Sequence, residues 1–224
     1  MTPHLTQLSQ DEAPFFYYGS DIISDIESRA LLDFFNTVPT GPVDRCDATQ
    51  EFAFVTHTGT RSAPGDRAEA AAGDPIWLGD DWGAGVSLPD LVARLRDRVG
   101  ELAASLPFED QLGWLPQVDF TSVYVDRYFS GGRFFPHTDG EDAYGPVIAG
   151  ASIGPGHAMF RLWGNVEVDR TPDAEFLLEP NSVYMFFGPI RNKPWLHAIS
   201  DVTDLRYGIT MRTRPSTRGS TTAR

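Results

Sequence analysis

Two residues with metal-binding side chains stand close together in the second half of the chain. His137 and Asp139 are two positions apart in the run RFFPHTDG. On a β-strand this spacing places both side chains on the same face, where an imidazole and a carboxylate can share one ion. The same run also suits a polar surface turn. The pair gains weight only with a third ligand, because an open iron(II) site for oxygen activation typically takes two histidines and one carboxylate.

A third candidate ligand and two arginines lie further along the chain. His197 occurs in WLHAIS, Arg206 follows nine residues later, and Arg212 six residues after that. His197 also suits a core histidine bonded to a backbone carbonyl, and Arg206 a surface charge. However, Arg206 stands in the largely apolar run LRYGI. An arginine buried there needs an anionic partner, and its planar fork suits the far carboxylate of 2-oxoglutarate.

The composition limits which other chemistry is available. Cys46 is the only cysteine, which excludes an intrachain disulfide and a thiolate metal cluster. The formal net charge of −13 argues against tight binding to nucleic acid. The chain has no run of about 18 apolar residues and no secretory signal at its start, so we expect a cytoplasmic protein without a membrane partner. Its oligomeric state is left open.

The first half of the chain predicts helices and a long irregular segment. Apolar residues recur at helical spacing over 20–38, behind a cap at Ser20 or Asp21, and again over a second helix that begins at Ser87. Residues 58–87 are rich in Gly, Ala, Asp and Thr with little periodicity. We expect a surface segment there, of the kind that forms lids over binding sites.

From about Val118 onward, short β-branched and aromatic runs alternate with turn residues, which is typical of a β-sandwich or barrel. These runs are FTSVYVDRYF, RFFPHTD, VIAGASI, AMFRLWG, EFLLE, SVYMFF, LHAIS and LRYGITMRTR. We therefore expect one domain over 1–214, mostly β with buttressing helices (α+β). It divides into an N-terminal helical and lid region, 1–117, and a double-stranded β-helix (jelly-roll) core, 118–214. A flexible tail follows at 215–224.

Taken in order, five runs of the core resemble one known family. They are DRYFSGGRFFPHTDGE, VIAGASIG, LLEPNSVYMFFGP, WLHAI and RYGITMR. Together they are similar to the AlkB-like iron(II)- and 2-oxoglutarate-dependent dioxygenases over about residues 118–214. The resemblance implies that His137, Asp139 and His197 bind Fe(II) and that Arg206 forms a salt bridge with the distal carboxylate of 2-oxoglutarate.

The resemblance also implies further contacts. Tyr128 and Arg212 would complete the cosubstrate pocket. Asp126 stands where many members have Asn, and its carboxylate would repel a dicarboxylate unless it turns away or pairs with a neighbouring arginine. Glu141 would contact the substrate, or is simply an exposed acid in its loop. Phe54 would lie in a substrate lid, or packs in the core.

The resemblance finally implies an enzyme that uses Fe(II), 2-oxoglutarate and O2 to oxidise a C–H bond, by hydroxylation or oxidative dealkylation, with release of succinate and CO2. The acidic body favours a small-molecule substrate. One alternative is an AlkB-type demethylase of alkylated nucleic-acid bases, which would need the five arginines of 206–224 to bind phosphates. Another is a non-catalytic jelly-roll binding domain, which would be expected to have lost one of the four central residues.

Overall fold

The computed structural model describes eight stretches of the chain. They are 4–7, 15–38, 40–42, 46–55, 76–78, 89–139, 144–165 and 171–213. Glu141, the expected tail and most of the expected lid lie outside these stretches. None of the helices within them is both long enough and apolar enough to span a membrane.

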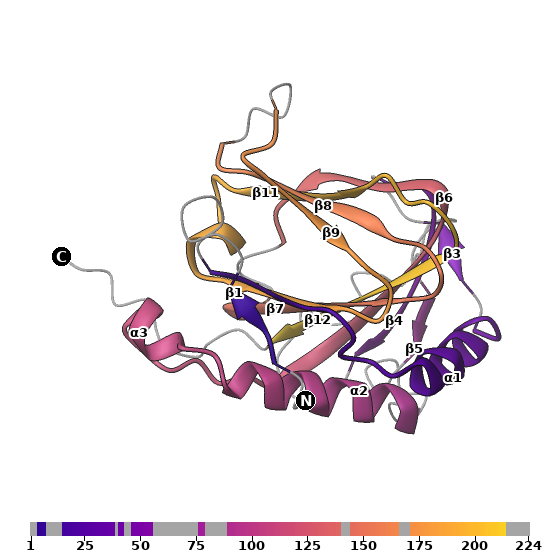
Figure 1. The fold of residues 1–224 in the computed structure, drawn as a ribbon, viewed down its shortest axis with the longest axis horizontal. Coiled ribbons are helices and arrows are strands. Elements are labelled where there is room, and N and C mark those ends of the chain that lie inside the picture. Colours follow the sequence, from indigo (N-terminus) through magenta and orange to yellow (C-terminus); the bar gives the residue numbers. More distant parts are fainter. Residues whose placement is uncertain are drawn as a thin grey trace, which may run out of the picture.

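β-Strands, nearly all of them paired antiparallel, are the main secondary structure of the described chain (Figure 1). In chain order they are β1 (Thr6–Gln7), β2 (Phe16–Gly19), β3 (Gly41–Pro42), β4 (Cys46–Val55), β5 (Ile76–Leu78), β6 (Phe120–His137), β7 (Val147–Ile153), β8 (Ala158–Trp163), β9 (Ala174–Leu178), β10 (Val183–Phe187), β11 (Leu196–Ser200) and β12 (Arg206–Thr213). Their order along the hydrogen-bonded path is β1-β2-β10-β7-β12-β6-β11-β8-β9, and β4 pairs with β6 as well. This arrangement confirms the expected jelly roll.

Strand β6 connects the two halves of the jelly roll. Its first half pairs with β12 and its last residues pair with β11. The strands therefore form two facing layers, called here the two sheets: one contains β12, β7 and β10, and the other contains β11, β8 and β9 (Figure 1). The sequence predicted two strands here. They form one continuous strand, and two glycines allow its backbone to bend. Gly131 takes a φ of +76°, which favours glycine. A Cβ at Gly132 would lie only 2.7 Å from the backbone oxygen of Phe129 and 2.9 Å from that of Ala48.

The N-terminal region, expected to be helical, also contributes strands to the sheet. Strand β2 pairs with β10, and β4 pairs with β6 from Cys46 to Val55. These pairings join segments far apart in the sequence, and β2 and β4 cannot be recognised as strands from local pattern alone.

Three α-helices are described: α1 (Asp25–Phe35), α2 (Asp90–Ala104) and α3 (Phe108–Leu112). Helix α1 begins later than expected, because its cap is Ser24 rather than Ser20 or Asp21, and Glu27 completes a capping box. The expected start of the second helix at Ser87 lies outside the described residues. The helices lie along the outer face of the sheet that contains β7 and β12 (Figure 1).

The strands of that sheet alternate between two apolar cores. Along β10, Val183 and Met185 belong to the core shared with the helices, whereas Tyr184 and Phe186 belong to the core between the two sheets. The same period of two operates along β12 and β6. It sends the following polar side chains into the space between the sheets: Tyr124, Asp126, Tyr128, Tyr184, Thr210 and Arg212.

Candidate metal centre and its pocket

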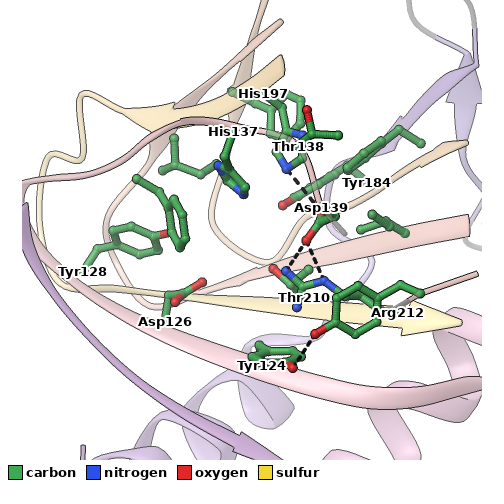
Figure 2. Close-up of a pocket in the computed structure, with 16 residues that line it drawn as sticks. Tyr124, Asp126, Tyr128, His137, Thr138, Asp139, Tyr184, His197, Thr210 and Arg212 are labelled. Carbon is green, nitrogen blue, oxygen red and sulfur yellow. Dashed lines mark hydrogen bonds and ion pairs between the residues drawn. The ribbon is translucent and has the colours of Figure 1, made fainter. Parts of the chain in front are cut away.

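His137, Asp139 and His197 meet in the space between the two sheets (Figure 2). His137 ends β6, and the register of β6 with β11 places His197 directly beside it. The two imidazole centroids are 4.3 Å apart, at an interplanar angle of 55°. Asp139 follows β6 by two residues, and the ligand atoms of all three side chains lie within 4.8 Å of one another. Antiparallel pairing thus brings together ligands that are 60 residues apart in the sequence.

The surroundings of His137 leave one ring nitrogen available as a ligand. Its Nδ1 lies 2.8 Å from the backbone oxygen of Phe135. Because only a protonated Nδ1 can donate to a carbonyl, Nε2 keeps its lone pair. Burial, and then the neighbouring His197, lower the pKa of His137 to about 3. The ring is therefore neutral near pH 7, as a metal ligand must be.

Asp139 is held through one carboxylate oxygen. Oδ1 accepts hydrogen bonds from Arg212 Nε at 2.8 Å and Nη2 at 2.6 Å. Oδ2 is buried, 3.4 Å from His197 Nε2, and has no hydrogen-bond partner in the described part of the chain. Burial alone would raise the pKa of Asp139, but Arg212 and the two histidines hold it well below the usual range. A buried anionic oxygen of this kind is satisfied by a divalent cation, so the three residues fit Fe(II).

Arg212 is itself fixed by two tyrosines. Its guanidinium carbon lies 4.3 Å from the ring centroid of Tyr124 and 4.8 Å from that of Tyr144. The two tyrosine hydroxyl oxygens are 2.6 Å apart, so the rings also hold each other. Burial would lower the pKa of Arg212, but the Asp139 carboxylate raises it above its ordinary value. Arg212 is therefore a fixed cation directed at a candidate metal ligand, and its expected contact with the cosubstrate stays a prediction.

Arg206 is buried deep in the same region, with 1% of its surface exposed. Its Nε donates to Ser152 Oγ at 2.9 Å, and its guanidinium carbon lies 5.3 Å from the Tyr128 ring centroid. Nη1 is buried and has no hydrogen-bond partner among the described residues. Burial, with a smaller effect from Asp126, raises the pKa of Tyr128 well above its usual value, so this phenol is a neutral donor.

A cavity of about 200 Å³ lies beside the candidate ligands, Arg212 and Tyr128. Asp126 and Tyr128 line one end of it, and the three candidate ligands line another part of its wall (Figure 2). Much of the rest is apolar: Phe134, Ile148, Phe160, Phe186 and Ile199. Such a wall excludes water and strengthens the electrostatic effects of the polar groups inside.

The two substrate residues suggested by the sequence have no described side chain. Glu141 lies outside the described residues. Phe54 lies in β4, where its backbone pairs with Val123 of β6, but its side chain is not among those described. Both therefore stay predictions, as does the role of Asp126, whose carboxylate is buried and lines the cavity.

Several residues in or beside the pocket were not singled out from the sequence. Tyr124, Tyr144, Tyr184, Ser152 and Thr210 all lie in or beside strands that the sequence predicts correctly. The signal that would have found them is the period of two. Positions two apart from Arg206, Arg212 or Tyr128 along a strand point into the same space, as do their lateral neighbours.

Comparison with known proteins agrees with this geometry. A model of the 2OG-Fe(II) oxygenase superfamily matches residues 69–224, which is more than half of the chain. The chain belongs to this superfamily. The oxygenase accordingly uses Fe(II), 2-oxoglutarate and O2. Comparison with curated proteins gives no significant sequence match.

Solved structures with the same fold come from different branches of such enzymes. The structure of OsALKBH1 matches with a TM-score of 0.60 and 17% identity, over 94% of the oxygenase and 100% of that chain. A Trichoplax adhaerens prolyl hydroxylase, in complex with a peptide fragment of the hypoxia inducible factor oxygen degradation domain, matches with a TM-score of 0.57 and 14% identity. The match covers 92% of the oxygenase and 86% of that chain. A Pseudomonas putida prolyl-4-hydroxylase matches with a TM-score of 0.56 and 12% identity, over 90% of the oxygenase and 93% of that chain. At these identities the likeness establishes the fold.

Proposed function

We propose that the oxygenase holds Fe(II) on His137, Asp139 and His197 and binds 2-oxoglutarate through Arg206. It oxidises a C–H bond of a small molecule, by hydroxylation or oxidative dealkylation, and releases succinate and CO2. The observation that carries this proposal is that an anionic and a cationic side chain of the same region each have a buried atom without a hydrogen-bond partner in the described part of the chain. Oδ2 of Asp139 lacks a hydrogen-bond partner beside the imidazoles of His137 and His197, and Nη1 of Arg206 also lacks one among the described residues.

Each residue has a physical task in this proposal. The bound iron and cosubstrate supply the oxidation itself. The hydrogen bond from Nδ1 of His137 to Phe135 orients the imidazole, and Arg212 keeps Asp139 ionised with one oxygen turned to the ligand cluster. Arg206 offers a fixed positive charge to a carboxylate, and its guanidinium lies over the Tyr128 ring. The apolar wall keeps water away from the reacting carbon.

The distribution of charge favours a small-molecule substrate over nucleic acid. The net charge is −13, and the arginine-rich end would have to supply the phosphate contacts. Two of its five arginines, Arg206 and Arg212, are buried or nearly so, and both point into the protein. The alternative of an AlkB-type demethylase is supported by the fold shared with OsALKBH1, but a shared fold is weak evidence for a substrate. A cytoplasmic location remains part of the proposal.

Formation of succinate tests the proposed chemistry without knowledge of the substrate. Many enzymes that oxidise a substrate in this way also decarboxylate the cosubstrate slowly without it, so we expect succinate from 2-oxoglutarate that requires both Fe(II) and O2. A panel of small molecules would then be screened for faster succinate release. Total absence of succinate, together with absence of cosubstrate binding, would support the non-catalytic binding domain instead.

The role of Arg206 is tested by Arg206→Lys, which keeps the charge but loses the planar fork. We expect the apparent KM for 2-oxoglutarate to rise at least about tenfold, because a hydrogen bond to a charged group contributes about 1.5–3 kcal/mol. Arg133→Lys is the matched control, since Arg133 lies on the surface and pairs with Asp47. An unchanged KM in Arg206→Lys would assign Arg206 to structure alone.

A further inference from the structure

Tyr184 has a position in the cavity that the proposed function does not use. It lies in the middle of β10, is 6% exposed, and points its hydroxyl into the pocket (Figure 2). Directly opposite, in β7, stands Gly150. A Cβ at Gly150 would overlap the end of the Tyr184 ring, hydroxyl included, so the absence of a side chain there lets the phenol lie across the neighbouring strand.

A second glycine accommodates Arg206 in the same way. A Cβ at Gly208 would lie 2.8 Å from Arg206 Nη1 and 3.1 Å from the Tyr128 ring. In the register of β7 with β12, Gly150 is opposite Thr210, while Ser152 is opposite Gly208. The two glycines are thus diagonal neighbours on the same face of the sheet. The Tyr184 ring and the Arg206 guanidinium thus each lie over one glycine of this diagonal pair.

The electrostatics agree with this arrangement. Burial raises the pKa of Tyr184 to about 12, and the largest opposing effect comes from the positive charge of Arg206. The phenol is therefore protonated at neutral pH and can donate a hydrogen bond. Packing alone does not require this hydroxyl, because the neighbouring positions of the same core are filled by Phe160 and Phe186.

We propose that Tyr184 is a further cosubstrate-binding residue, whose hydroxyl donates a hydrogen bond to the distal carboxylate of 2-oxoglutarate beside Arg206. This inference rests on the proposed function. Ser152 already accepts from Nε of Arg206, so a carboxylate cannot take the side of the guanidinium that presents Nε. A carboxylate that meets the remaining nitrogens has further lone pairs to satisfy, and in a buried site each needs a donor. Tyr184 supplies one.

The test compares Tyr184→Phe with the wild-type oxygenase. Both are loaded with Fe(II) without oxygen and titrated with 2-oxoglutarate, and binding is followed by the visible charge-transfer absorption of the complex. We expect about tenfold weaker binding in Tyr184→Phe, because one hydrogen bond to a charged acceptor is lost. Tyr18→Phe is the control and should bind normally, since that hydroxyl lies outside the cavity, 3.3 Å from Glu179.

A double-variant cycle separates a shared carboxylate from a general disturbance. If Tyr184 and Arg206 hold the same carboxylate, the combined Arg206→Lys/Tyr184→Phe variant should lose less affinity than the product of the two single losses. Fully multiplicative losses, or normal binding by Tyr184→Phe, would overturn the inference about Tyr184. A wild-type protein that shows no absorption with Fe(II) and 2-oxoglutarate would instead overturn the proposed function, so the two failures are distinguishable.

Discussion

The two oxygens of Asp139 have different partners, and this division defines the centre at the scale of residues. Oδ1 accepts two hydrogen bonds from Arg212, which leaves Oδ2 facing His197. A carboxylate fixed at one oxygen presents the other in a single direction, so less conformational freedom is lost when a cation binds. The tyrosines on either side of Arg212 extend this support away from the ligands.

Arg212→Lys should therefore weaken metal binding without removing a ligand. Lysine keeps the charge but cannot donate two hydrogen bonds to Oδ1 of Asp139 or stack between Tyr124 and Tyr144. We expect the dissociation constant for Fe(II), measured by anaerobic titration, to rise by roughly 10–100-fold, as is usual when a residue that orients a ligand is changed. Arg133→Lys again serves as control. Equal Fe(II) affinity in Arg212→Lys and the control would show that Arg212 does not position Asp139.

Residues with distinctive chemistry could be singled out from the sequence, and those with ordinary chemistry could not. His137, Asp139 and His197 were candidates because few other residue types bind iron, and the structure brings them together. The Arg206 position was informative because a guanidinium in an apolar run needs a partner. Tyr124 and Tyr184, by contrast, look like any aromatic residue in a buried strand. Their role depends on which strand lies beside them, and Tyr184 reaches the pocket only because Gly150 is opposite.

At the scale of elements, α1 shows how a local hydrogen bond decides where a helix begins. The apolar residues that start at Ile22 suggested an earlier beginning, but Asp21 has a φ of +53° and the capping box forms at Ser24. Ile22 and Ile23 are buried before the helix starts, whereas Ile26 within it is 75% exposed. Periodicity thus located the helix, and the capping interactions fixed its first turn.

The ion pair between Glu27 and Arg98 joins α1 to α2 and should have a measurable pH dependence. Hydrogen bonding to Arg98, against a smaller effect of burial, lowers the pKa of Glu27 to about 2 from an ordinary value of 4.5. Because the folded pKa is the lower one, the ionised carboxylate stabilises the fold above pH 4.5, and this contribution is lost as the pH falls toward 2. Glu27 is 40% exposed, so solvent screening keeps the effect small.

We expect Glu27→Gln to lower the free energy of unfolding by less than about 1 kcal/mol near pH 7. Urea unfolding at a series of pH values measures this difference, which should shrink between pH 4.5 and about 2. Glu101→Gln, at an exposed position of the same helix pair, is the control and should match the wild type throughout. A constant difference at every pH would mean that the ion pair is not the cause.

The strands after Val118 could be predicted and those before it could not, because the earlier strands depend on partners far away in the sequence. The later runs are bounded by turn residues, and their β-branched and aromatic composition makes the local pattern sufficient. Strand β2 is only four residues long and finds its partner β10 more than 160 residues later. Strand β4 pairs with β6 across the two helices. Pairings of this kind leave little trace in a local window.

At the scale of the whole molecule, the charge and the direction of the buried arginines predict weak binding to nucleic acid. The chain carries 31 acidic against 18 basic residues. We expect only weak affinity for a single-stranded DNA oligonucleotide, with little change between low and physiological salt. Each phosphate neutralised would add about −0.7 to the slope of log affinity against log salt. A slope equivalent to several phosphates would favour the AlkB-type demethylase.

The same view of the molecule explains why the pocket forms where it does. One sheet packs on helices through its outer face, and both sheets contribute aromatic residues to the inner space. Polar groups that project inward are thereby removed from water, which makes each of them costly unless it is paired or meets a ligand. Oδ2 of Asp139 and Nη1 of Arg206 are buried without a hydrogen-bond partner among the described residues, which supports the proposal that ligands bind beside them.

The most direct test of the central claim is the anaerobic absorption spectrum of His137→Ala with Fe(II) and 2-oxoglutarate. The wild type and a His157→Ala control, whose ring lies beside Thr203 rather than in the cavity, should both show the visible charge-transfer band. His137→Ala should lose it, because His137 supplies one of the three proposed ligands. An unchanged band in His137→Ala would contradict the proposal that His137, Asp139 and His197 hold the iron.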